Sequence, residues 1–107
     1  MRLNPFYPIN YLAVFGDALV HQGRSQEALE VFNEIVRRQP TYISAHLHLA
    51  GLHSSLGKMT SARAAVAEVL RLNPHYSVEA AASFYLAADQ SRKQTFLDNL
   101  RSAGLPD

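Results

Sequence analysis

Two stretches of sequence decide the fold: GDALVHQGRSQEALEVFNEIVRRQP at residues 16–40 and AGLHSSLGKMTSARAAVAEVLRLNP at residues 50–74. At an offset of 34 residues, they align a glycine with a glycine, an alanine with an alanine and a proline with a proline. Such coincident offsets indicate an internal repeat. The aligned pairs are Gly23 with Gly57, Ala28 with Ala62, and Pro40 with Pro74.

Apolar residues within each repeat recur at the three- and four-residue spacing of a helix. Glycine readily adopts the left-handed conformation that ends a helix, and proline cannot continue one. Each repeat is therefore predicted to be a pair of helices that turns at its glycine and ends at its proline, and the second helix of the first repeat is expected over residues 25–38. Ser25 and Thr60 are expected to accept hydrogen bonds from free amides at the starts of the second helices.

The repeat pattern extends beyond these two stretches. Residues 2–5 (Arg-Leu-Asn-Pro) recur as residues 71–74, so residues 1–8 are interpreted as the end of an upstream repeat and a linker, which favours an origin in a longer protein. Residues 75–107 form a diverged unit with a helix expected around residues 78–88 and another from about 91 to 102. The last helix has Phe96, Leu97 and Leu100 on one face, and its polar back is expected to cap the C-terminal end.

A 34-residue helix pair with small residues at its close-packing positions resembles the tetratricopeptide repeat (TPR). Gly16 and Ala50 match the small residue of the family's first helix. The resemblance implies an all-α fold, a right-handed α-α superhelix (TPR-like helix-turn-helix solenoid), in a single domain over residues 1–107 with units at 9–40 and 41–74. The chain departs from the family at the large aromatic positions of the first helix, which hold Leu12, Leu19, His46 and His53.

The amino-acid composition excludes several classes of binding partner and site. Ten Lys and Arg residues against nine Asp and Glu residues give a net charge of +1, which provides no strong field for nucleic acid or an anionic membrane. No cysteine is present, which excludes disulfides and thiolate zinc sites. The longest apolar run near the N-terminus is far shorter than the roughly 20 residues of a membrane helix, and no signal peptide precedes it. The chain is therefore expected to be soluble and cytoplasmic.

The side chains give no indication of catalysis. His46 and His48 lie about 200° apart around a helix, and His46 and His53 lie roughly 10 Å apart along it, so neither pair can chelate one ion. His46 and His53 are instead interpreted as packing residues. No nucleophile elbow, phosphate-binding glycine loop or paired catalytic carboxylates are present. The chain is predicted not to be an enzyme and to need no metal or other cofactor.

The TPR resemblance implies that the first helices line a concave groove that holds a peptide or partner helix. The carboxylate clamp of chaperone-binding TPR domains is absent, and Asp17 and Glu79 disfavour an acidic peptide. The alternative is a groove that faces solvent or is filled by the chain's own tail. The residues expected to line it are Asn10, Ala13, Val14, Asp17, Val20, His21, Ser44, Leu47, His48, Gly51, Ser54 and Ser55.

A second surface is expected at the N-terminal end, where four aromatic residues lack a preceding helix pair to cover them. They are candidates for self-association into a homodimer, unless they fold back onto the first unit. These residues are Phe6, Tyr7, Tyr11 and Phe15.

The predicted function is protein–protein interaction with a protein or peptide partner. A narrower resemblance concerns the tail: Leu-Arg-Ser-Ala-Gly-Leu-Pro at residues 100–106 is similar to the C-terminal TPR tails of bacterial proteins with an adenylate/guanylate cyclase domain. It implies a non-catalytic module in the C-terminal part of a larger bacterial signalling or regulatory protein. The alternative is a homo-oligomerisation or structural module with no groove ligand.

Overall fold

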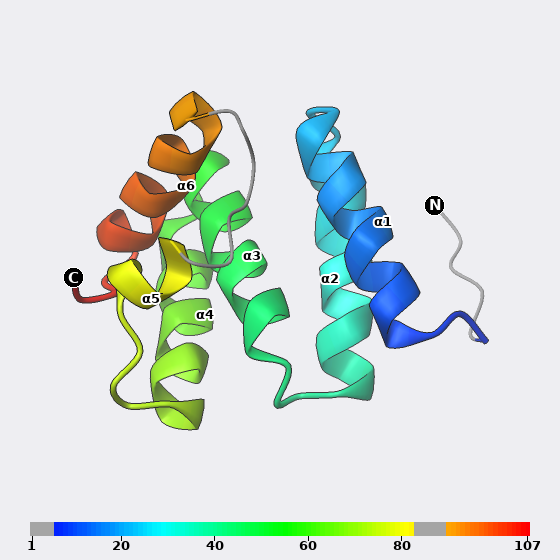
Figure 1. Cartoon of the computed structure of the whole chain (residues 1–107), viewed down its shortest axis with the longest axis horizontal. Helices are drawn as coiled ribbons and strands as arrows, with labels where there is room; N and C mark the ends of the chain where they lie inside the picture. The colour runs from blue at the N-terminus through cyan, green and yellow to red at the C-terminus, as the bar shows by residue number, and fades with distance from the viewer. Residues whose placement is uncertain (1–5, 83–89) are drawn as a thin grey trace. The chain divides into compact units, whose positions relative to one another are not determined.

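The computed structural model describes residues 6–82 and 90–107, and these residues form helices and connecting turns without a strand (Figure 1). The all-α prediction is confirmed. The chain divides into two compact units, Met1–Ala45 and His46–Asp107, which are described separately below. The helices are α1 (Ile9–His21), α2 (Ser25–Arg38), α3 (Ile43–Ser55), α4 (Met59–Leu72), α5 (Val78–Ala82) and α6 (Gln90–Ser102). The single domain expected over residues 1–107 stays a prediction.

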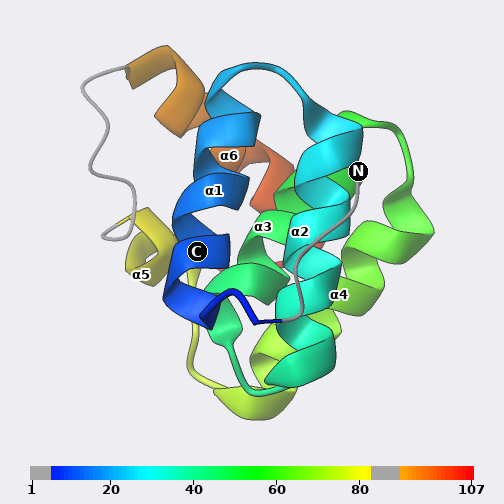
Figure 2. The same ribbon diagram turned by 90° about the vertical axis from the view of Figure 1, so that its right-hand side faces the viewer.

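The first unit is built from α1 and α2, which lie side by side (Figure 2). Their facing sides are apolar: Leu12 and Leu19 of α1 are buried, as is Phe32 of α2. The helices come close because Gly16 has no side chain. A Cβ atom at Gly16 would lie 2.8 Å from Cζ of Phe32, so the small residue predicted at this position is required by the packing.

The turns after α1 and α3 share one main-chain arrangement. Gly23 and Gly57 have φ angles of 73° and 77°, as their predicted role requires. The amide of Gly23 donates to the carbonyl of Val20, and the amide of Arg24 donates to that of Leu19. This pattern is a Schellman motif, which satisfies carbonyls that the end of the helix leaves open. The turn at Gly57 repeats both bonds.

The predicted capping by Ser25 and Thr60 is wrong. The N-cap positions of α2 and α4 are Arg24 and Lys58, and neither helix start has a side-chain cap hydrogen bond. The physical reason is the Schellman turn, because it places the residue after each glycine at the N-cap. The carbonyl of that residue then accepts the first helical hydrogen bond, from Ala28 in α2 and from Ala62 in α4.

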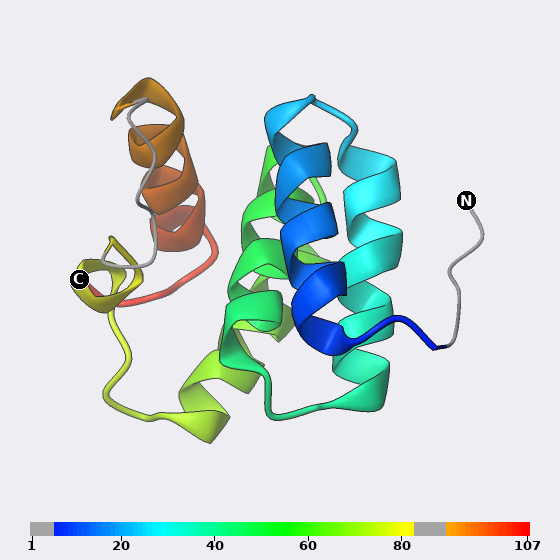
Figure 3. The same ribbon diagram turned by 45° about the vertical axis from the view of Figure 1, so that its right-hand side comes forward.

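In the second unit, buried residues lie on nearly all sides of α3, and α4 buries Ala62, Ala65, Val66 and Val69. The short helix α5 packs with α6 (Figure 3). Val78 and Leu100 are buried, and the amide of Val78 donates to the carbonyl of Pro106 over 2.7 Å. The end of α6 agrees with the prediction, and the helix expected over 78–88 is described only as far as Ala82, since residues 83–88 lie outside the described residues.

Candidate protein-binding surfaces

The exposed face of α1 carries one part of the predicted groove. Asn10, Val14, Asp17 and His21 follow the spacing of a single helix face, and all four are exposed. Val14 is the apolar member and is 71% exposed. Nδ1 of His21 lies 2.9 Å from the carbonyl oxygen of Asp17 and 3.9 Å from a carboxylate oxygen of the same residue. Along this face, polar side chains therefore lie before and after an apolar side chain that water contacts. We call these four residues the α1 face.

The other predicted groove residues of α1 and α3 differ in accessibility. Ala13, Val20, Ser44, His48 and Ser54 are half-buried, and Ser55 is exposed. Leu47 is only 2% exposed, and Gly51 is buried as well. The expectation that these last two residues offer surface to a partner is corrected. Buried residues surround α3 on nearly every side, so a position on it cannot be assigned to a free face by periodicity alone.

Phe96 of α6 accounts for the burial of Gly51. A Cβ atom at Gly51 would lie 3.0 Å from both Cδ1 and Cε1 of Phe96. The same ring lies beside His48, with ring centroids 5.8 Å apart and planes inclined by 36°. We call His48 and Gly51 the α3 contact site. Here the chain's own C-terminal helix occupies residues predicted to face a partner, which supports the alternative in which the tail fills part of the groove.

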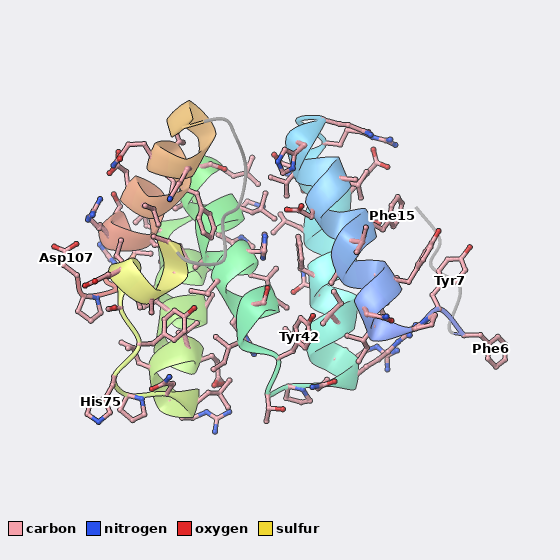
Figure 4. All side chains as sticks on the ribbon, viewed as in Figure 1. Phe6, Tyr7, Phe15, Tyr42, His75 and Asp107 are labelled. Carbon is pink, nitrogen blue, oxygen red and sulfur yellow. The ribbon has the colours of Figure 1, made fainter. Side chains whose placement is uncertain are left out.

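The N-terminal aromatic residues form a second surface, which we call the aromatic surface. Phe6 is 89% exposed and Tyr11 is 52% exposed, and the rings of Tyr7 and Tyr11 lie 4.9 Å apart. Phe15 is half-buried, so it contributes less area than the others. Figure 4 shows Phe6, Tyr7 and Phe15 on one side of α1.

A polar contact holds the aromatic surface to the end of α2. Nη1 of Arg38 donates a hydrogen bond to the carbonyl of Tyr7 over 2.6 Å. Glu34 pairs with both Arg37 and Arg38. Hydrogen bonds from these guanidinium groups, first from Arg37 and then from Arg38, lower the pKa of Glu34 to about 2. The Glu34–Arg38 pair follows from helical spacing, whereas no pattern in the sequence indicated the bond to Tyr7.

The histidines predicted as packing residues are inside the second unit to different degrees. His46 is buried, and His53 is half-buried with its Nδ1 atom buried and without a hydrogen-bond partner. Burial, together with the nearby charge of Lys58, lowers the pKa of His53. Among the described residues, no group of three His, Cys, Asp or Glu side chains could hold a metal ion.

These observations define a class: a helix-pair repeat protein that exposes an aromatic surface and a mostly polar helix face with one large apolar side chain. Comparison with known proteins identifies the repeat. The family profile described as "Tetratricopeptide repeat" matches residues 19–90, and the chain belongs to this family. Repeats of this family generally mediate protein–protein interactions and are typically non-catalytic scaffolds.

One curated relative was found in Fusarium oxysporum f. sp. lycopersici, the tetratricopeptide repeat and J domain-containing co-chaperone. It is 37% identical to this chain over 59 residues. The match covers 53% of this chain and 11% of the co-chaperone, so the chain corresponds to a small part of that protein.

Among the described residues, none of the helices combines the length and the apolar composition that a membrane span requires.

Proposed function

We propose that the chain is a non-catalytic protein-binding module that holds a peptide or helix against α1, the first helix of its first repeat. The observation that carries this proposal is the α1 face, where Val14 is 71% exposed among polar neighbours. A single exposed apolar side chain is common on protein surfaces, so Val14 has weight here because it lies among the residues predicted to line the groove.

The proposed mechanism is burial of Val14 against an apolar side chain of the partner. Full burial of a valine side chain contributes about 1.5–3 kcal/mol, enough for this residue to be a hot spot. Asn10, Asp17 and His21 orient the partner through hydrogen bonds. Because α1 is already folded as a helix in the free chain, the partner meets a preorganised surface, which reduces the entropic cost of binding.

The test uses a peptide ligand selected from a displayed library on the purified chain. We expect Val14→Asp to weaken binding of that ligand at least tenfold, because a carboxylate would replace the apolar contact. Ala67→Asp adds the same charge at an exposed position of α4 and serves as the matched control. Equal binding by the wild-type and Val14→Asp chains would contradict the proposal.

A second candidate function is self-association through the aromatic surface, which is favoured by the exposure of Phe6 and Tyr11. A homodimer would bury these rings against their copies across a twofold axis. We expect the mass in solution, measured by light scattering, to rise with concentration from one chain towards two. Tyr11→Asp should abolish this rise and Ala67→Asp should not. A constant monomer mass would contradict this candidate.

We further propose that the parent protein is a larger bacterial signalling or regulatory protein with this chain in its C-terminal, cytoplasmic part. The tail at residues 100–106 supports an adenylate or guanylate cyclase as the parent. Determining the complete reading frame that encodes this chain tests this proposal directly. A nucleotide cyclase domain upstream supports the proposal, and a frame without one contradicts it.

A further inference from the structure

We propose that α6 is an intramolecular ligand of the α3 contact site, and that an external helix binds there by presenting its own aromatic side chain in place of Phe96. The inference rests on the proposed function, since it names the kind of partner that this part of the chain accepts. The resting chain would then hold the site closed with its own helix.

Gly51 shows that the α3 contact site fits a ring. Glycine is disfavoured inside a helix relative to alanine, so a glycine in the middle of α3 has a packing reason. That reason is the edge of Phe96, which would lie 3.0 Å from a Cβ atom at this position. This separation is shorter than ordinary carbon–carbon contact, so even a methyl group at position 51 would push the ring away.

His48 supplies the second contact for the ring. It precedes Gly51 by three residues and lies on the same side of α3. Its ring centroid lies 5.8 Å from that of Phe96 in a tilted arrangement, within the range of favourable aromatic pairs. The imidazole thus faces a planar aromatic group, while the glycine leaves room for its edge. This pair of contacts favours an aromatic side chain over a branched aliphatic one.

The attachment of α6 is uneven along its length. Its C-terminal end is fixed to α5, because Leu100, Ala103 and Leu105 are buried and the carbonyl of Pro106 accepts a hydrogen bond from Val78. Earlier in the helix, Gln94 and Thr95 are exposed and Phe96 is half-buried, whereas Leu97 beside it is buried. The proposed exchange therefore requires the part of α6 around Phe96 to move while the buried C-terminal contacts with α5 persist.

The partner implied by this arrangement is an amphipathic helix with a phenylalanine on its apolar face. In α6 the apolar residues Phe96, Leu97 and Leu100 follow helical spacing, and Asp98 and Arg101 lie on exposed positions. A helix of this pattern can bind through a few anchors at such spacing. Since α6 is linked to α3 in the same chain, it competes at a high effective concentration, which lowers the apparent affinity for any external helix.

The test uses a fluorescently labelled peptide with the sequence of residues 90–103 and the full chain, with binding measured by fluorescence anisotropy. We expect the Phe96→Ala chain to bind this peptide at least tenfold more tightly than the wild type, because the ring of the peptide then enters a vacant site. Tyr42→Ala removes a half-buried ring from the first unit and should leave the wild-type affinity unchanged.

Two further variants test whether the peptide uses the α3 contact site. A peptide in which Ala replaces the residue equivalent to Phe96 should bind at least tenfold more weakly. Adding Gly51→Ala to the Phe96→Ala chain should remove the gain in affinity, because its Cβ atom would obstruct the incoming ring. If circular dichroism shows that Phe96→Ala loses helix, Phe96→Leu replaces it with the same expectation, since leucine retains apolar contact without a planar ring.

Equal affinity of the wild-type and Phe96→Ala chains for the peptide would overturn the inference, as would a gain in affinity that survives Gly51→Ala. Either result can be separated from failure of the proposed function. A ligand that depends on Val14 would still support the proposed function when the α6 peptide does not bind. If no ligand depends on Val14 and the α6 peptide does not bind either, both proposals are contradicted.

Discussion

Gly16 is the residue at which packing and helix propensity oppose each other. Alanine is favoured over glycine in a helix interior by about 1 kcal/mol, so propensity alone predicts that Gly16→Ala stabilises the chain. The Cβ atom would, however, lie 2.8 Å from the ring of Phe32, which is itself buried. We expect a net loss of about 1–3 kcal/mol in the free energy of unfolding, as for other overpacked cores.

Urea denaturation measures this loss. As a control, the same Gly16→Ala substitution is made in a chain that carries Phe32→Leu. In that background the methyl group of Gly16→Ala has more room, so its cost should fall by at least half. A stabilising effect of Gly16→Ala in the wild-type chain would show that the ring moves aside freely and that the close approach is not required.

The imidazole of His53 is expected to make stability depend on pH. Its pKa is lowered in the folded chain by burial and by Lys58, so near neutral pH the unfolded chain binds the proton more readily. The stabilisation from this residue is complete above the unfolded pKa of about 6.5 and is lost as the pH falls below it towards the lower folded pKa. We expect the free energy of unfolding to be lower at pH 5 than at pH 7.5.

His53→Gln should reduce this difference, as measured by urea denaturation at the two pH values. His75→Gln changes an exposed histidine and should leave it as in the wild type. An unchanged pH dependence in the His53→Gln chain would show that other groups cause it.

At the scale of elements, the start of the first unit depends on the end of α2. Hydrogen bonds from Arg37 and Arg38 lower the pKa of Glu34 to about 2, and Arg38 also donates to the carbonyl of Tyr7. The stabilisation from the Glu34 carboxylate is present above its unfolded pKa of about 4.3 and is lost as the pH falls through about 2. Glu34→Gln should cost about 1 kcal/mol at pH 6, and this difference should shrink towards pH 2.

Thermal unfolding at several pH values measures the cost of Glu34→Gln. Glu30→Gln is the control, because Glu30 is exposed on the same helix. A cost that stays constant from pH 6 to pH 2 would mean that the carboxylate charge is not responsible.

The turns between helices give a prediction that involves the main chain alone. Gly23 has a φ of 73°, and a Cβ atom there meets nothing within 4 Å, so any cost of substitution comes from the left-handed backbone. Gly23→Ala should lower the free energy of unfolding by about 1–2 kcal/mol. Gly23→Asn should cost less, because asparagine tolerates this conformation better. Denaturant titration of both variants tests the order, which would be contradicted if alanine were the better tolerated.

The helices and their turns could be predicted because they depend on local sequence. Helical spacing located the buried faces of α2 and α4, and Gly23 and Gly57 located the turns. On α3, however, the same spacing assigned the buried Leu47 and Gly51 to a free face. Two features could not be predicted in this way. The N-caps at Arg24 and Lys58 follow from main-chain geometry, which has no side-chain signature. The contact between Phe96 and Gly51 joins residues far apart in the chain, and local periodicity gave only the apolar face of α6.

At the scale of the whole molecule, the near balance of charge has a consequence for association. With a net charge of +1, long-range electrostatics between copies is weak, so a homodimer would be held by apolar contacts, for which the aromatic surface is the candidate. We expect the mass measured by light scattering to stay the same between about 50 and about 500 mM sodium chloride, a range over which the screening of charges increases strongly. Sodium sulfate should raise it, since this salt strengthens apolar burial. Dissociation in sodium chloride would instead indicate an electrostatic interface.

The main-chain turn described for α1 and α3 also has an evolutionary consequence. Because its two hydrogen bonds join backbone atoms, natural selection acts on a single glycine and leaves the adjoining side chains free to change. Within this chain the residue before the glycine has already diverged, being Gln22 in one repeat and Leu56 in the other. Duplicated copies of this turn can therefore diverge at the adjoining positions as long as the glycine is kept.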